Sequence, residues 1–267
     1  MELVCLDRDH PGFRDRAYRA RRDAIAKLAF EHRDGDPVPE VVYTDDEHAV
    51  WREVRARLVP LHARRACREV LEAQARLPLD HDRIPQLEAV NRALARLTGM
   101  RLLPVAGLAS AREFMMRLAD DVFLATQYIR HHSRPLYTPE PDVVHELVGH
   151  AATLSHPRFV ALNRQFGVAS GRAEAREVER LIRVYWYTLE FGLVREAGEL
   201  KAVGAGLLSS FGELAEFETC AEIRSFDLER IAETPFDPTS YQRQLFAAES
   251  FEVFEAALVD WLAFAGR

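Results

Sequence analysis

The sequence predicts a mainly α-helical protein with small β components, folded as a single helical domain. Apolar residues recur at helical spacing along most of the chain. Its 267 residues are 48% hydrophobic and 29% charged, an ordinary composition for a packed soluble protein. No repeat or low-complexity linker divides the chain, and its length fits about one to two domains.

Net charge and cysteine content exclude several classes of protein. With 35 basic and 42 acidic residues the formal net charge is −7, which disfavours binding to nucleic acid or to an anionic membrane. No apolar run in the sequence approaches the ~18 residues of a membrane span, and the N-terminus lacks a secretory apolar core. Cys5, Cys67 and Cys220 are scattered and odd in number, so we expect no disulfide scaffold and a cytoplasmic location.

The N-terminal part of the chain is predicted to form two helices. Residues 14–33 have helical spacing and a basic surface that we expect to face solvent, formed by Arg14, Arg16, Arg19, Arg21 and Arg22. Turn residues cluster at 34–39 and separate this helix from the next one. Thr44 and Glu47 have the spacing of a capping box, which predicts a helix over 45–59.

Periodicity and turn residues predict the remaining elements. Two more helices are expected over 62–76 and 84–98, with Pro85 near the first turn of the second and Gly99 beyond its end. Residues 100–105 form a plausible short strand. Further helices are expected at 110–119, 141–148, 156–166, 174–194 and 250–264, and short strands at 199–203 and 222–226.

The densest group of metal-binding side chains is His145, Glu146 and His150. The HExxH pattern of zinc hydrolases places its histidines at i and i+4 on one helix face. Here the spacing is i+5, which would separate the two rings by about 140° on a regular helix. We expect Gly149 to end the helix, so that His150 swings back toward His145. The zinc-hydrolase interpretation is weakened but stays open.

A third ligand is available from the expected helix at 174–194. Glu190 falls within an apolar stripe at helical spacing, made of Val178, Leu181, Ile182, Tyr185, Trp186, Leu189 and Leu193. A buried carboxylate is costly unless a cation compensates its charge. Two histidines and one carboxylate form a facial triad, which suits non-haem Fe(II) chemistry with oxygen. Structural histidines and an ion pair between Glu190 and an arginine remain alternatives at this point.

Long blocks of sequence, in the same order along the chain, match a known protein family over some four-fifths of the chain. They lie at 84–88, 101–108, 126–131, 137–150, 185–193, 201–214 and 248–251. These blocks resemble the catalytic domain of the pterin-dependent aromatic amino acid hydroxylases, especially the bacterial phenylalanine 4-hydroxylase type. The resemblance implies that family's single-domain helical fold and a monooxygenase that uses Fe(II), tetrahydropterin (tetrahydrobiopterin or a bacterial analogue) and O₂. It also implies small-molecule partners, an aromatic amino acid and the pterin.

The resemblance assigns roles to individual positions. His145, His150 and Glu190 match the iron ligands, and Arg130 matches the arginine that binds the substrate carboxylate, a task suited to a guanidinium fork. An ion pair between Arg130 and Asp142 is the structural alternative, and both can hold at once. The remaining substrate-side matches are Thr138, Trp186, Phe191, Gly206 and Ser209; the pterin-side matches are Gly107, Leu108, Ala109, Ala111, Phe114, Glu146 and Tyr185. Ala111 and Leu124 depart from the animal pattern, where serine and histidine are common.

Pocket residues favour phenylalanine as the substrate and tyrosine as the product. Trp186 is larger than the phenylalanine of tryptophan-hydroxylating relatives, and Ala247 replaces an acidic residue of tyrosine-hydroxylating relatives. Phe191 and Gly206 keep a pocket shape that favours the para carbon. Each such difference in the pocket changes the discrimination between two substrates by ~1–3 kcal/mol of transition-state free energy. The alternatives are 5-hydroxylation of tryptophan, meta-hydroxylation of phenylalanine, and a non-catalytic metal- or ligand-binding scaffold.

The last expectations concern the division into domains and the oligomeric state. We divide it into an N-terminal helical extension, 1–41, and a catalytic iron- and pterin-binding domain, 42–267. The extension is too short for the regulatory domain of animal relatives, and too few residues follow the matched blocks for their tetramerising helix. We therefore expect a monomer, with the extension packed on the outside of the domain.

Overall fold

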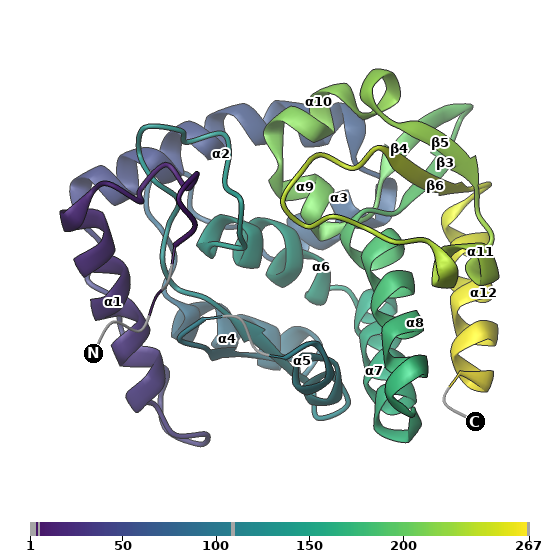
Figure 1. The fold of residues 1–267 in the computed structure, drawn as a ribbon, viewed down its shortest axis with the longest axis horizontal. Helices are drawn as coiled ribbons and strands as arrows, with labels where there is room; N and C mark the ends of the chain where they lie inside the picture. Colours follow the sequence, from purple (N-terminus) through teal and green to yellow (C-terminus); the bar gives the residue numbers. More distant parts are fainter. Residues whose placement is uncertain (1–3, 5, 108–109, 266–267) are drawn as a thin grey trace.

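The computed structural model describes residue 4, residues 6–107 and residues 110–265. Helices dominate it, as the sequence predicts, and two small sheets lie among them (Figure 1). The α-helices are α1 (Arg16–Glu31), α2 (Asp45–Arg65), α3 (Arg68–Arg76), α4 (Leu87–Leu97), α5 (Ala111–Leu118), α6 (Ala152–Leu154), α7 (Pro157–Arg172), α8 (Ala175–Tyr185), α9 (Ala205–Ser209), α10 (Phe211–Cys220), α11 (Leu228–Glu233) and α12 (Phe251–Phe264). Two π-helices are present as well, η1 (His145–Ala151) and η2 (Trp186–Glu190).

Six short strands form the two sheets among the described residues. They are β1 (Arg101–Pro104), β2 (Val122–Ala125), β3 (Leu193–Glu196), β4 (Glu199–Ala202), β5 (Glu222–Ser225) and β6 (Gln244–Ala248). β1 and β2 pair in parallel, and the other sheet has the order β4-β3-β6-β5. β3 and β4 form an antiparallel hairpin, whereas β6 runs parallel to both of its neighbours. Ala247 of β6 pairs with Leu193 of β3 and is buried at the centre of this sheet.

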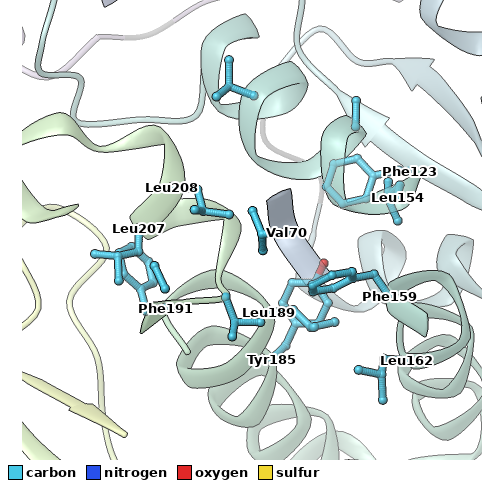
Figure 2. Close-up of a cluster of buried hydrophobic side chains, with 14 of the residues drawn as sticks. Val70, Phe123, Leu154, Phe159, Leu162, Tyr185, Leu189, Phe191, Leu207 and Leu208 are labelled. Atoms are coloured by element: carbon cyan, nitrogen blue, oxygen red, sulfur yellow. The ribbon is translucent and has the colours of Figure 1, made fainter. Parts of the chain in front are cut away.

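The hydrophobic core lies where elements from distant parts of the chain meet. Figure 2 shows side chains of α3, β2, α6, α7, α8, η2 and α9, together with Phe191 just after η2, packed into one cluster. The labelled residues are Val70, Phe123, Leu154, Phe159, Leu162, Tyr185, Leu189, Phe191, Leu207 and Leu208. Tyr185, η2 and α9 therefore share a core with the strand and helices that precede them in sequence. In the described part of the chain, no helix is both long and apolar enough to cross a membrane.

Several sequence-based boundaries need correction. α2 continues through Pro60 to Arg65, and α7 runs six residues beyond the predicted end at 166. The helix predicted over 174–194 ends at Glu190, and β3 begins at Leu193. The strands β2, β3 and β6 and the helices α6, α9, α10 and α11 were not predicted. The capping box is confirmed, because the Thr44 hydroxyl accepts from the Glu47 amide and the Glu47 carboxylate accepts from the Thr44 amide.

The prediction that all the arginines of the first helix face solvent is wrong for Arg22. This side chain is 3% exposed and donates to the Glu140 carboxylate at 2.7 Å. Because a buried guanidinium needs a partner, the inward face of α1 is tied to the loop that precedes η1.

Candidate metal centre

Three possible metal ligands converge from two π-helices. His145 and His150 lie in η1 and Glu190 ends η2, and one donor atom of each lies within 4.8 Å of the others. The two Nε2 atoms are 3.0 Å apart. A Glu190 oxygen lies 2.9 Å from the His150 Nε2 atom, and the other lies 3.8 Å from that of His145. The structure thus brings together the three side chains that the sequence predicted as ligands.

The π-helical turn explains how a five-residue spacing brings both rings to one side. Its hydrogen bonds run from i to i+5, so residues five apart lie one above the other. The expectation that Gly149 ends the helix is therefore wrong, since η1 continues to Ala151 and α6 follows directly. Gly149 has a different role: a Cβ atom there would lie 2.7 Å from the Ala205 carbonyl oxygen, so glycine allows α9 to approach η1 closely.

The protonation states of this cluster suit a divalent cation. Burial lowers the pKa of His145 to about 4, so its imidazole is neutral and has a free lone pair at neutral pH. Burial would raise the pKa of Glu190, but the neighbouring His150 and His145 outweigh it and hold the pKa below its usual value. Two imidazoles and one carboxylate form a donor set that fits a ferrous ion.

Ser209 fixes the orientation of the His145 ring. The His145 Nδ1 atom lies 3.0 Å from the Ser209 hydroxyl, which itself donates to the Gly206 carbonyl at 3.1 Å. The hydroxyl must then accept from Nδ1–H, which leaves the Nε2 lone pair toward Glu190 and His150. Both Ser209 and Gly206 belong to α9, the helix whose close approach to η1 is allowed by Gly149.

Replacing Ser209 with alanine is expected to weaken iron binding by about 10–100-fold, because the ring of His145 loses the partner that sets its tautomer. The affinity can be measured by competition with a coloured chelator under anaerobic conditions. Ser170→Ala is the matched control, since this serine is also buried but its hydroxyl has no hydrogen-bond partner among the described residues. Equal affinities for Ser209→Ala and wild type would contradict the orienting role.

Arg130 and Asp142 form a fully buried ion pair beside the cluster. The Arg130 Nε and Nη2 atoms donate to the two Asp142 carboxylate oxygens at 2.9 and 2.7 Å, and the Arg130 amide adds a bond of 2.8 Å. Asp142 also accepts from the His145 amide at 3.2 Å, so the pair is joined to the start of η1. The ion-pair alternative for Arg130 is therefore confirmed. Thr138 lies in the same loop and donates to the Glu140 carbonyl.

An aromatic wall lies on the η2 side of the cluster. The ring of Trp186 stacks on Phe236, with centroids 4.2 Å apart, and contacts Phe191 at 4.7 Å. The Trp186 indole donates to the side-chain oxygen of the buried Gln242 at 3.0 Å. A Cβ atom on Gly206 would lie 2.7 Å from the Phe191 ring, so glycine gives this ring its room. Phe236 and Gln242 were not predicted, because they lie in a loop without periodicity.

The predicted pterin side is partly formed by described residues. Phe114 of α5 makes edge contacts with Phe123 and Tyr185, whose centroids are 5.1 and 5.6 Å away. Tyr185 is buried and donates to Asn163 at 3.1 Å. Gly107 and Ala111 are exposed near the start of α5, while Leu108 and Ala109 lie outside the described residues.

Glu146, also predicted on the pterin side, is a buried carboxylate in η1. One of its oxygens accepts from the Thr126 amide at 3.1 Å and from the Thr126 hydroxyl at 3.0 Å. Burial raises the pKa of Glu146 to about 7, although these hydrogen bonds oppose the shift. Thr126 follows β2, a strand that the sequence did not predict, so this partner of Glu146 was missed as well.

Sequence comparisons agree with this arrangement. The family model described as biopterin-dependent aromatic amino acid hydroxylase matches residues 3–265. Tyrosine 3-monooxygenase of Mus musculus is 50% identical over 251 residues, which cover 92% of this chain and 50% of the relative. Phenylalanine-4-hydroxylase of Caenorhabditis elegans is 44% identical over 267 residues, covering 98% of this chain and 58% of the relative. The chain spans about half the length of the curated relatives it matches.

Solved structures of a bacterial phenylalanine hydroxylase share the fold. The enzyme of Chromobacterium violaceum with bound Fe(III) matches with a TM-score of 0.81 and 32% identity, covering 90% of both chains. Its structure with iron(III) and 7,8-dihydrobiopterin has a TM-score of 0.79 and covers 90% of this chain and 94% of that one. The resemblance recognised in the sequence is thus confirmed: the chain belongs to the biopterin-dependent aromatic amino acid hydroxylase family.

Proposed function

We propose that this protein is an iron- and tetrahydropterin-dependent monooxygenase that hydroxylates free L-phenylalanine to L-tyrosine. The observation that carries the proposal is the meeting of His145, His150 and Glu190 beside a wall of aromatic rings. Three ligands on one side of a metal leave coordination positions open for oxygen, as in non-haem Fe(II) oxygenases. Family membership and the solved relatives with iron and dihydrobiopterin support the same reaction class.

The cofactors supply the oxygen chemistry, and the protein supplies binding and orientation. Iron and a reduced pterin would, when bound, supply the activation of O₂, one atom of which enters the aromatic ring. His145, His150 and Glu190 would hold the metal through two imidazoles and one carboxylate. Phe114 and Tyr185 offer ring contacts on the pterin side, and the Glu146 carboxylate faces the same side with one oxygen held by Thr126.

The amino acid is positioned by a second group of residues. The Asp142 carboxylate accepts hydrogen bonds from the Nε and Nη2 atoms of Arg130, and these two bonds fix the plane of the Arg130 guanidinium. A substrate carboxylate would therefore meet a rigid hydrogen-bond donor. Thr138 lies in the loop beside it, and its hydroxyl is oriented by the Glu140 carbonyl. A donor held in place before binding loses little entropy when the substrate arrives, which favours orientation of the ring toward the metal.

Trp186 and Ala247 support phenylalanine as the ring that is hydroxylated. The indole of Trp186 is fixed by Phe236, Phe191 and Gln242, so it occupies space that a bulkier indole substrate would need. Ala247 is buried in β6 and offers no charged partner for a phenolic hydroxyl. Tyrosine 3-hydroxylation is the second candidate, because the Mus musculus tyrosine 3-monooxygenase is 50% identical to this chain.

Product analysis decides between these substrates. The iron-loaded protein, given a tetrahydropterin, O₂ and each aromatic amino acid in turn, is expected to convert phenylalanine mainly to para-tyrosine. Because one pocket contact is worth ~1–3 kcal/mol, phenylalanine should exceed tryptophan in kcat/KM by about 10–100-fold, and Trp186→Phe should narrow that gap. The substrate assignment would be contradicted if the main product were dihydroxyphenylalanine formed from tyrosine, meta-tyrosine formed from phenylalanine, or 5-hydroxytryptophan formed from tryptophan. No product from any of them would favour a non-catalytic scaffold.

A further inference from the structure

The N-terminal segment contacts both sides of the chain around Arg130. Tyr18 of α1 donates its hydroxyl hydrogen to the Ile129 carbonyl at 3.0 Å. Asp15, which caps α1, lies 3.2 Å from the His131 Nε2 atom. The ring of Tyr18 also packs edge-on against His131, with centroids 4.8 Å apart. The residues immediately before and after Arg130 are therefore both held by residues more than one hundred positions earlier in the sequence.

A second set of contacts holds the loop that carries Thr138 and Asp142. Arg22 donates to Glu140 at 2.7 Å, and His10 lies 3.3 Å from the same carboxylate oxygen. Burial would raise the pKa of Glu140, but the hydrogen bonds from His10 and Arg22 outweigh it and lower the pKa. Glu140 is therefore a carboxylate anion at neutral pH, held between two N-terminal side chains.

Two more hydrogen bonds hold this loop, one at Glu140 and one at the residue after it. The Glu140 carbonyl oxygen accepts from the Thr138 hydroxyl at 2.8 Å, and the next residue, Pro141, accepts from the Tyr128 hydroxyl. The Arg22 guanidinium carbon lies 3.2 Å from the centroid of the Tyr128 ring, a close cation–π contact. One buried arginine thus contacts both Glu140 and Tyr128, the two residues that fix this loop.

We propose that the side chains of His10, Asp15, Tyr18 and Arg22 form a positioning brace for the carboxylate-binding side of the active site. The brace acts through Ile129, His131 and Glu140 on the position of Arg130 and its partner Asp142. This inference rests on the proposed function, in which Arg130 receives the carboxylate of the amino acid. Arg22 is then a positioning residue, whose loss moves the carboxylate donor without touching the metal ligands or the pterin side.

The test compares substrates with and without a carboxylate. L-phenylalanine and L-phenylalaninamide are titrated into the iron-loaded protein by calorimetry, and KM and kcat are measured for L-phenylalanine. Because a displacement of about 1 Å can reduce a well-positioned interaction by up to about a hundredfold, Arg22→Met should weaken L-phenylalanine binding and raise its KM about ten- to a hundredfold. The value of kcat for L-phenylalanine should fall as well, because a displaced carboxylate donor no longer orients the ring toward the metal. Binding of the amide and the KM for pterin should change less than about twofold, since the contacts of these compounds are intact.

Matched variants separate positioning from general damage. Arg22→Lys keeps a charge for Glu140 and should restore part of the affinity for L-phenylalanine. Arg21→Met is the control on the same helix, because Arg21 makes a bidentate ion pair with Glu47 of α2 and does not contact the brace's targets. It should behave as the wild type. If Arg22→Met does not fold, Tyr18→Phe removes the bond to the Ile129 carbonyl and the bond that the Tyr18 hydroxyl accepts from Arg22, but it keeps the bond between Arg22 and Glu140. It should therefore give a smaller loss of the same selectivity.

The outcomes distinguish this inference from the proposed function. Equal weakening of L-phenylalanine and its amide, or a loss of iron together with affinity, would show a merely structural role and overturn the inference. A wild type that binds L-phenylalanine but forms no hydroxylated product would contradict the proposed reaction, while a selective loss in Arg22→Met would still support the brace. A wild type that binds neither compound would contradict both.

Discussion

Glu190→Gln is expected to lose its iron and with it all hydroxylation above background. Glutamine keeps the size of the side chain but removes the negative charge from a site where two imidazoles are the other donors. The loss of iron affinity should exceed the 10–100-fold that is typical when only a partner outside the ligand set is removed, so we expect more than about a hundredfold. Iron content after anaerobic loading and gel filtration, with turnover measured on the same sample, provides the measurement.

Glu69→Gln is the matched control for this change. Glu69 is also a deeply buried carboxylate, but it pairs with Arg68 and Arg158. Its replacement should leave the iron content of the protein unchanged. If Glu190→Gln retained a full equivalent of iron, or if both variants lost it alike, Glu190 would not be a ligand.

Asp142→Ala is expected to cause the largest loss of stability in the region of the site. It leaves the Arg130 guanidinium, which is 3% exposed, without its bidentate partner and removes the acceptor of the His145 amide. Breaking a buried ion pair from one side costs about 3–5 kcal/mol. In urea unfolding of the iron-free protein, this lower free energy of unfolding should appear as a lower urea concentration at the midpoint of the transition.

An exposed ion pair gives the comparison. Lys27 and Glu31 lie one turn apart on α1 at 3.6 Å, with exposed side chains. Glu31→Ala should lower the free energy of unfolding by no more than about 0.5 kcal/mol. Similar midpoints for Asp142→Ala and Glu31→Ala would mean that the buried pair does not stabilise the fold.

Local signals predicted much of the helical framework and the identity of the clustered side chains. The Thr44 capping box sets the start of α2, and the expected strand at 100–105 is present as β1. Residue type, spacing and an apolar stripe made His145, His150 and Glu190 candidate ligands, and the family resemblance then favoured them over structural histidines and an ion pair. Local signals are sufficient for caps and helical periodicity, because these depend on neighbours in the sequence.

The features that were missed depend on contacts between distant segments. Residues 145–151 form a π-helix that α9 approaches closely at Gly149, and no local pattern encodes this contact. β6 pairs with β3 and β5, and its assignment needs those partners. Gln242 and Phe236 reach Trp186 from a loop about fifty residues away, and Arg22 reaches Glu140 over a separation of 118 residues. Tertiary contacts of this kind override local propensity.

The most direct test of the iron site is anomalous diffraction at the iron absorption edge, from crystals loaded anaerobically with Fe(II). We expect one anomalous peak per chain, within bonding distance of the two Nε2 atoms of His145 and His150 and of the Glu190 carboxylate. Two other groups of possible ligands exist among the described residues, Asp15 with His131 and His132, and Cys67 with Glu69 and Glu196. A peak at either of these groups and none between His145, His150 and Glu190 would contradict the account.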